Sequence, residues 1–283
     1  QKGIVPMRYG MTSIMPHESP NQWAEDLAKR GFTAAYFPAK ETASDREIFA
    51  YEKAAKDHNL VIAEMGIWKT PFAQDSKEAE KNKNICLRRL EIADAVGAKC
   101  CVNVSGAAGE IWYAYYPENY SEATYWKNVE FVQWLLDTAK PKSTYYALEI
   151  MPWMLPDSAE SYLKFLWDVN RDRFAVHFDP VNLINSVEKV RHYGDMLESA
   201  VIQMHPYIKS CHLKDFLLAD GYTPNVRETI PGRGWADLSR YLKLIHRLDP
   251  QMPMLFEHLH TWEDYEEALA HVQQLESRLF PQD

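Results

Sequence analysis

Short apolar runs alternate with amphipathic segments along the whole chain. The apolar or β-rich runs lie at residues 8–14, 34–38, 61–67, 100–105, 145–151, 174–179, 208–214 and 252–258. The segments between them have helical periodicity, and several open on Ser, Asp or Thr and close on Gly or Asn, which are helix-capping residues. The pattern predicts eight strands, each followed by a helix.

Eight strand–helix repeats without a flexible linker predict one (β/α)8 TIM barrel spanning residues 1–283. Parallel strands need helical crossovers and are buried on both faces, which suits these nearly continuous apolar runs. A doubly wound sheet would carry a glycine-rich phosphate fingerprint after its first strand, and the sequence has none there. Two long connections, 106–120 and 216–236, each follow a strand, so we expect them on the face where barrels hold active sites.

A carboxylate interrupts the apolar stretch YYALEIMPW at Glu149. Burying an unpaired carboxylate is costly, so this side chain needs a partner. Counting every second residue places Glu149 near the end of its strand, pointing inward, and the same count on the next three strands places Asp179, His212 and Glu257 at the same rim. Three carboxylates would repel one another unless a cation holds them. Oxygen donors with one nitrogen favour Mn²⁺, Mg²⁺ or Co²⁺ over a thiolate-rich zinc site.

A simpler interpretation treats each of these residues as satisfied separately. Asp179 would cap the turn before Pro180, His212 would be a core histidine, and each glutamate would pair with a nearby Arg or Lys. Repetition of the pattern on four successive strands favours the shared site, because buried strands seldom carry charge without a partner.

The elements LEIMPW, HFDPVN, SCHLKD, PGRG and FEHL occur in this order on successive repeats. Together they resemble the xylose isomerase-like TIM barrel superfamily, which includes sugar isomerases and epimerases, inositol-pathway enzymes and metal-dependent endonucleases. The resemblance implies that Glu149, Asp179, His212 and Glu257 hold a divalent metal, commonly manganese. It also implies that Glu149 and Glu257 move protons.

The resemblance leads to the hypothesis of a metal-dependent sugar isomerase or epimerase that removes a proton next to a carbonyl. Ketose epimerases of the superfamily generally carry a His where this chain has Asn182, and polar sugar-binding residues where it has Met151 to Trp153. A related group cleaves C-glycosides of aromatic compounds after oxidation to the 3-keto sugar, as one subunit of a hetero-complex. That lyase reaction begins with the same proton abstraction and is kept as the alternative.

Further candidates lie on or near the predicted rim. As additional catalytic residues we consider His177 and Lys214, and as substrate-binding residues Trp112, Trp153, Asn182 and Arg233. Most of these residues also have a structural interpretation. His177 could be a core histidine, and Lys214 could pair with a carboxylate. The two tryptophans could pack a loop, and Arg233 lies in a Pro-Gly-Arg-Gly sequence that is typical of a turn. Glu64 and Asn103 lie on earlier strands and carry less weight.

Net charge and residue types indicate which classes of partner the protein is able to bind. The formal net charge of −9 lacks the basic surface that nucleic-acid binding needs, so we expect no nucleic-acid partner. The endonuclease reading also requires extra histidines after strands three and four, where the chain has Gly-Ile-Trp and Asn-Val-Ser. A non-catalytic barrel stays open as an alternative, since a fold does not guarantee an activity.

The cysteine spacing and the hydropathy of the chain predict its cellular compartment. The four cysteines have no CxxC spacing, no run of eighteen apolar residues is present, and the N-terminal residues lack an apolar signal core. We therefore expect a cytoplasmic protein without a membrane partner. Its substrate would be a small sugar or glycoside, and it would form a homo-oligomer or a hetero-oligomer with a second subunit.

Overall fold

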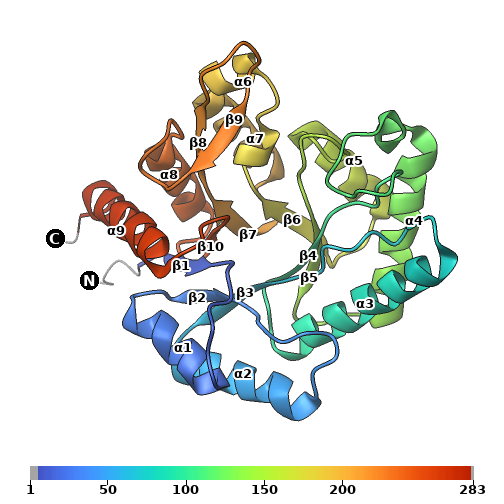
Figure 1. The fold of residues 1–283 in the computed structure, drawn as a ribbon, viewed down its shortest axis with the longest axis horizontal. Coiled ribbons are helices and arrows are strands. Elements are labelled where there is room, and N and C mark those ends of the chain that lie inside the picture. The colour runs from blue at the N-terminus through green and yellow to red at the C-terminus, as the bar shows by residue number, and fades with distance from the viewer. Residues whose placement is uncertain (1–5, 282–283) are drawn as a thin grey trace.

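The computed structural model describes residues 6–281 and contains a parallel sheet of eight strands curled into a nearly closed barrel (Figure 1). The strands are β1 (Arg8–Met11), β2 (Ala34–Tyr36), β3 (Val61–Gly66), β4 (Cys100–Asn103), β5 (Tyr145–Glu149), β6 (Phe174–Phe178), β7 (Ile208–Leu213) and β10 (Pro253–Phe256). Their order in the sheet is β1-β10-β7-β6-β5-β4-β3-β2. The predicted TIM barrel is confirmed.

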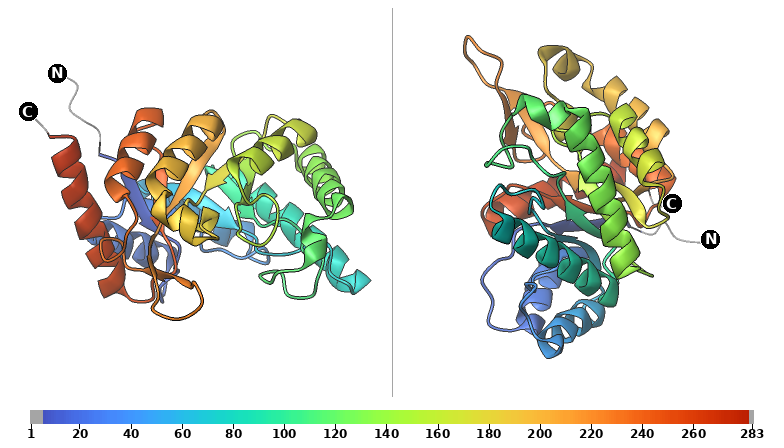
Figure 2. Two further views of the ribbon diagram at one scale, coloured as in Figure 1. Left: turned by 90° about the horizontal axis from the view of Figure 1, so that it is seen from above. Right: turned by 90° about the vertical axis from the view of Figure 1, so that its right-hand side faces the viewer.

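Helices surround the sheet on its outer side (Figures 1 and 2). They are α1 (Pro20–Lys29), α2 (Asp45–Asp57), α3 (Ser76–Ala95), α4 (Glu122–Ala139), α5 (Ala159–Val169), α6 (Val187–Arg191), α7 (Tyr193–Met204), α8 (Leu238–Leu248) and α9 (Trp262–Leu279), with short 3-10 turns η1 (Pro117–Tyr120) and η2 (Val181–Leu183). Side chains such as Ser19, Asp75 and Thr261 accept a hydrogen bond from a first-turn N–H and thereby cap α1, α3 and α9.

The barrel interior is filled by small apolar side chains at its lower levels. Ala34, Ala63 and Leu255 form one apolar cluster, and Cys100, Val102 and Ala147 form a second. Further along β5 and β10 in the chain direction, the inward positions become glutamates. The polar site is therefore restricted to the carboxyl-terminal mouth, where parallel strands of a barrel end together.

A bulge in β3 breaks the alternation of inward and outward side chains. Ala35 pairs with Ile62, but Tyr36 pairs with Glu64, so β3 has one residue more than β2 at this point. As a result Ala63 packs in the barrel interior and the next residue, Glu64, also turns inward, as its contacts with the interior histidines show. Bulges commonly re-aim a side chain in this way.

The two ends of the sheet meet between β1 and β2. The backbone N–H of Thr33 donates to the carbonyl of Tyr9 over 2.8 Å. A Cβ atom on Gly10 would lie 2.3 Å from the carbonyl oxygen of Ala34, so only glycine permits this approach. β1 and β2 approach this closely because β1 carries no side chain at the point of contact.

The long connection after β7 contains an element that the sequence pattern did not reveal. Two antiparallel strands, β8 (Asp215–Leu218) and β9 (Val226–Thr229), form a hairpin that projects from the barrel (Figure 2). The hairpin is additional to the eight barrel strands. It brings residues of the 216–236 connection over the barrel mouth.

The base of this hairpin is organised by one buried carboxylate. Asp215 accepts hydrogen bonds from the backbone N–H groups of Phe216 (2.8 Å), Ala236 (2.9 Å), Gly232 (2.9 Å) and Gly234 (2.9 Å). A Cβ atom on Gly234 would lie 2.3 Å from an oxygen of Asp215. The Pro-Gly-Arg-Gly turn wraps this carboxylate, so the close approach explains Gly234, while the left-handed φ of Gly232 (102°) favours glycine there.

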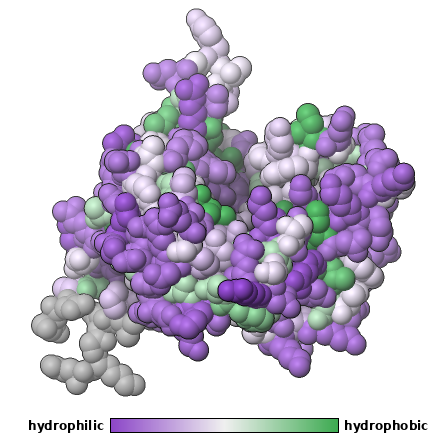
Figure 3. Space-filling model, turned by 60° about the horizontal axis from the view of Figure 1, so that its bottom comes forward, coloured by the Kyte–Doolittle hydropathy of each residue, from purple (hydrophilic) through white to green (hydrophobic). Residues whose placement is uncertain are grey.

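One face of the molecule is shown in space-filling form in Figure 3. The face in Figure 3 is mostly hydrophilic, with small apolar patches separated by polar residues. Within the part of the chain that the structure describes, no helix is both long and apolar enough to cross a membrane. All four cysteines are buried and free.

Candidate metal and substrate site

Four side chains from the last four barrel strands converge at the carboxyl-terminal mouth. Glu149 ends β5, Asp179 follows β6, His212 lies on β7 and Glu257 follows β10. The Nδ1 atom of His212 lies 3.3 Å from Glu149 Oε1, 3.3 Å from Asp179 Oδ2 and 3.2 Å from Glu257 Oε2. The structure thus brings together the residues that the period-two count placed at one rim, and they form a group that could hold a metal ion.

The geometry of this cluster fits a divalent cation. One nitrogen and three carboxylate oxygens, all within 4.8 Å of one another, form a donor set that a divalent cation could bind. A single hydrogen on His212 Nδ1 could not serve three carboxylate oxygens. Burial and the neighbouring Glu257 carboxylate raise the pKa of Glu149 to about 8, whereas His212 and Lys214 hold the pKa of Glu257 well below its usual range despite burial.

The two carboxylate oxygens of Asp179 have different partners: one accepts backbone hydrogen bonds and the other faces the cluster. Oδ1 accepts the backbone N–H of Val181 at 3.0 Å and of Asn182 at 3.4 Å, while Oδ2 faces His212. The Asp-Pro sequence, followed by the turn η2, fixes this orientation. The capping role of Asp179 is therefore fulfilled by one oxygen, and the other contacts His212 and Lys214 in the cluster.

Lys214 is a buried ammonium beside the cluster. Its Nζ lies 2.8 Å from Asp179 Oδ2, 2.6 Å from Glu257 Oε2 and 3.1 Å from Glu228 Oε1. Burial alone would lower the pKa of Lys214, but these carboxylates hold that pKa well above its usual range. Lys214 therefore stays charged and partly balances the acids at the mouth.

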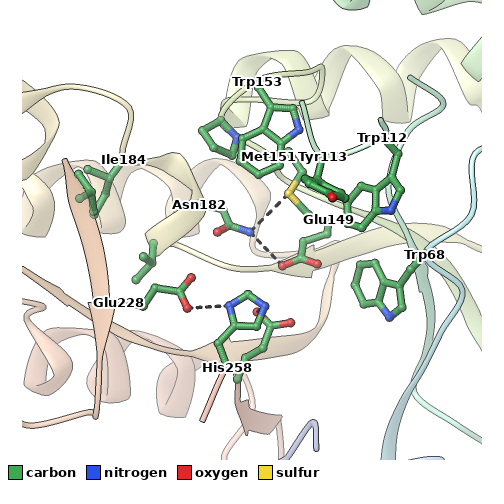
Figure 4. A pocket seen from close by; sticks show the side chains of 14 residues that line it. Trp68, Trp112, Tyr113, Glu149, Met151, Trp153, Asn182, Ile184, Glu228 and His258 are labelled. Atoms are coloured by element: carbon green, nitrogen blue, oxygen red, sulfur yellow. Dashed lines mark hydrogen bonds and ion pairs between the residues drawn. The ribbon is translucent and has the colours of Figure 1, made fainter. Parts of the chain in front are cut away.

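Asn182 links the cluster to the lysine. Its Nδ2 donates to Glu149 Oε1 over 3.0 Å, and its Oδ1 accepts from Lys214 Nζ over 3.3 Å. The amide thus holds one oxygen of Glu149 in place, as Figure 4 shows. A neutral side chain at this position can position a carboxylate without adding charge.

A cavity of about 510 Å³ opens over the cluster, within the size range of small-molecule sites. Polar and apolar side chains both line it, and the tryptophans lie across the cavity from Glu228 (Figure 4). The polar side chains are Glu149, Asn182, Glu228, Glu257 and His258, and the aromatic and sulfur-containing ones are Trp68, Trp112, Tyr113, Met151 and Trp153. The predicted substrate-binding residues Trp112, Trp153 and Asn182 all line this cavity.

The structure places two other candidates elsewhere. The guanidinium of Arg233 pairs with Glu267 on α9 over 2.6 and 2.7 Å and is not part of the cavity wall. His177 is fully buried in the layer below, where its Nδ1 lies 2.6 Å from Ser210 Oγ. Neither residue is positioned to touch a substrate in the cavity, because a tertiary ion pair holds Arg233 and depth in the barrel encloses His177.

Three residues near the site were missed or given little weight. Glu64 lies fully buried against His212, and its sequence signal, a carboxylate within an apolar strand, is the same as that of Glu149. Glu228 reaches the cavity from β9, a position with no local signal in the sequence. His258 follows Glu257, and its Nδ1 lies 2.6 Å from Glu228 Oε2. The hydrogen bond to Glu228 raises the pKa of His258.

Comparison with solved structures finds the same fold in several proteins of low sequence identity. A xylose isomerase domain protein from Planctomyces limnophilus shares 17% identity over 97% of this chain and 98% of that one, with a TM-score of 0.71. A xylose isomerase-like TIM barrel protein from Mycobacterium smegmatis in complex with magnesium shares 17% identity over 97% of each chain, with a TM-score of 0.69. A 3-keto-D-glucoside 4-epimerase from E. coli shares 14% identity over 95% of this chain and 99% of that one, with a TM-score of 0.69.

Sequence comparison identifies the family. A search of curated proteins finds no match. The family model described as xylose isomerase-like TIM barrel matches residues 22–275, which is most of the chain. The arrangement of eight parallel strands and the location of the site at their carboxyl ends agree with that match. The chain belongs to the xylose isomerase-like TIM barrel family.

Proposed function

We propose that this protein is a metal-dependent isomerase or epimerase that removes a proton from the carbon next to the carbonyl of a sugar or sugar derivative. The observation that carries the proposal is the pair Glu149 and Glu257, whose oxygens lie 3.3 and 3.2 Å from the same histidine nitrogen at the floor of the cavity. Two carboxylates beside a bound carbonyl compound can remove and return a proton.

Glu149, Asp179, His212 and Glu257 would hold the cation, which in the bound state polarises a substrate carbonyl. Of the two glutamates Glu149 and Glu257, one removes the proton from the carbon next to the carbonyl and the other returns it. Asn182 orients Glu149 through the 3.0 Å hydrogen bond, and Lys214 holds Glu257 through the 2.6 Å contact. We propose manganese as the ion, with magnesium or cobalt as alternatives; the relative from Mycobacterium smegmatis is a magnesium complex.

The cavity supports a keto-sugar or a glycoside as the substrate. Carboxylate, amide and imidazole groups on one side can bind hydroxyls, and the tryptophans on the other side can stack on a sugar ring. The structurally similar protein from E. coli is a 3-keto-D-glucoside 4-epimerase, which agrees with this substrate class.

A lyase that cleaves aromatic C-glycosides after oxidation to the 3-keto sugar is the second candidate. The specific observation in its favour is the aromatic wall formed by Trp68, Trp112, Tyr113 and Trp153, which offers apolar surface for an aglycone. Such a reaction would use the same first proton abstraction. We propose a homo-oligomer for the epimerase and a hetero-oligomer with a second subunit for the lyase.

Proton exchange tests the function directly. The Mn²⁺-loaded protein is incubated in D₂O with free ketoses, 3-keto-glucosides and 3-keto aryl C-glycosides, and deuterium next to the carbonyl is followed by NMR. We expect exchange with at least one class, and we expect Glu149→Gln and Glu257→Gln each to reduce it by roughly 10²–10⁴-fold, because each variant lacks a proton-transfer group. Release of a phenolic product would identify the lyase.

A surface variant provides the matched control. Glu267→Gln alters the ion pair with Arg233 on the outside of the barrel and should exchange protons like the unaltered protein. Circular dichroism checks that all three variants are folded. Near-normal exchange in Glu149→Gln or Glu257→Gln would remove that residue from the proposed mechanism.

A further inference from the structure

A second layer of polar side chains lies beneath the candidate metal cluster. Glu64, His177 and Ser210 are fully buried there. The carboxylate oxygens of Glu64 lie 3.2 and 3.3 Å from Nε2 of His212, and one of them lies 3.6 Å from Nδ1 of His177. His212 is therefore in contact with carboxylates on both edges of its ring.

The two nitrogens of His212 have different surroundings. Nδ1 faces the three rim carboxylates, whereas Nε2 faces Glu64 alone. A histidine coordinates a cation through the nitrogen that carries no hydrogen, and an ionised carboxylate can only accept. When a cation takes the electron pair of Nδ1, the one remaining ring hydrogen lies on Nε2, where the carboxylate of Glu64 can accept it.

We propose that Glu64 is a positioning residue that fixes the tautomer and ring orientation of His212 and thereby sets the affinity of the site for its divalent cation. This inference rests on the proposed metal-dependent function. Carboxylates that hold the far nitrogen of a metal-binding histidine typically contribute 10–100-fold to metal affinity. The bulge that turns Glu64 inward, between Ala35/Ile62 and Tyr36/Glu64, thus has a functional consequence.

A second cation among Glu64, His177 and His212 is the competing explanation, since their ligand atoms also lie close enough to share one ion. Two arguments favour positioning. A histidine that bound one cation at each nitrogen would have to lose both of its ring hydrogens. In addition, Nδ1 of His177, the nitrogen nearest to Glu64, is already engaged with Ser210 Oγ at 2.6 Å. We expect one ion per chain.

Binding of Mn²⁺ alone, without substrate, tests the inference. The metal-free full-length protein and the variants Glu64→Gln and Glu64→Met are titrated with MnCl₂ by calorimetry. We expect one Mn²⁺ per chain, a loss of affinity of about 10–100-fold in Glu64→Met, and a smaller loss in Glu64→Gln, which keeps an oxygen acceptor. Ser210→Ala is the matched control, because Ser210 lies in the same buried layer and contacts His177.

A spectroscopic readout separates positioning from general weakening. In the Mg²⁺-loaded protein, which is diamagnetic, the Nε2 hydrogen of His212 should resonate downfield and exchange slowly with water because Glu64 accepts it, and Glu64→Met should lose both features. Met has a length similar to Glu, so the barrel should still pack; if that variant does not fold, Glu64→Gln carries the comparison.

The outcomes are distinguishable. Unchanged Mn²⁺ affinity in the folded Glu64 variants would overturn the positioning role alone. Two Mn²⁺ ions per chain, one of which is lost in Glu64→Met, would replace it with a second metal site. Absence of Mn²⁺ binding by the unaltered protein would overturn the metal-dependent function, and this inference with it.

Discussion

At the scale of single residues, backbone conformation marks the cavity. Among residues 6–281, the non-glycine residues with positive φ are Asn59, Trp68, Lys140, Asn170 and His258. Lys140 and Asn170 cap helix ends, and Asn59 follows α2, where left-handed residues are common. Trp68 (φ 54°) and His258 (φ 59°) instead follow strands and line the cavity. Strained residues concentrate at functional sites.

This strain predicts the order of stability of two variants. His258→Gly should unfold at higher urea concentration than His258→Ala, by about 1 kcal/mol in the free energy of unfolding, because glycine has no Cβ to clash in the left-handed region. The same pair of changes at His205, which has helical backbone angles, should give the reverse order. Equal stability of the two His258 variants would contradict the assigned strain.

Asp94 shows how one carboxylate joins two segments. Its Oδ1 accepts backbone N–H groups of Lys142 (2.9 Å), Ser143 (2.6 Å) and Thr144 (3.0 Å), which connects the end of α3 to the start of β5. Burial alone would raise the pKa of Asp94, but these backbone donors outweigh it and hold the pKa below its usual range.

We therefore expect Asp94→Asn to lose about 1–2 kcal/mol of stability at pH 7, since the backbone donors lose a charged acceptor. A lowered pKa in the folded protein stabilises it above about pH 4, and this contribution is lost as the pH falls through the folded value. The difference in urea midpoint between Asp94→Asn and the unaltered protein should therefore shrink between pH 5 and pH 3. A constant difference would show that ionisation of Asp94 plays no part.

At the scale of elements, the β8–β9 hairpin completes the site. It carries Glu228 to the cavity, where that carboxylate contacts Lys214 at 3.1 Å and His258 at 2.6 Å. The hairpin is anchored at its base by the buried Asp215 and the glycine-rich turn. An insertion in one barrel connection thus adds a charged group that the eight strands do not supply.

Removing the anchor should loosen the hairpin. Asp215→Ala leaves four backbone N–H groups without their acceptor, so we expect a loss of about 2–4 kcal/mol in the free energy of unfolding. We also expect faster amide hydrogen exchange in residues 226–236. Asp220→Ala, at the exposed tip of the hairpin, is the control and should change neither quantity. Unchanged exchange in Asp215→Ala would show that other contacts hold the turn.

At the scale of the whole molecule, the barrel mouth concentrates negative charge. Glu64, Glu149, Asp179 and Glu257 surround His212, with Lys214 as the buried ammonium beside them. The apolar floor of the barrel gives these acids little solvent. A bound cation would therefore stabilise the folded chain as well as serve the chemistry.

Thermal unfolding tests this coupling. A ligand at 100 times its Kd that binds only the folded chain adds about 2.7 kcal/mol, which for a chain of this size raises Tm by roughly 4–8 °C. We expect Mn²⁺ to raise Tm by an amount of this order and EDTA to reverse it. Glu257→Gln, which removes one proposed ligand, should show a smaller rise. An identical Tm with Mn²⁺ and with EDTA would contradict the metal site.

The sequence by itself determined the barrel and the convergence of four residues. Alternating apolar runs and capped amphipathic segments specify eight strands and their crossovers, and parallel strands must end at one mouth. Counting by two along β5 and the later strands therefore identified Glu149 and His212 as neighbours without any coordinates.

Only the tertiary structure decided the rest, because those contacts join segments whose pairing no local pattern encodes. The bulge that turns Glu64 toward His212 depends on how β2 pairs with β3. Glu228 lies at the site because the β8–β9 hairpin places it there. Arg233 lies outside the site because it pairs with Glu267 on α9. Periodicity reports which face of a strand is buried, whereas partners and register follow from packing of the whole chain.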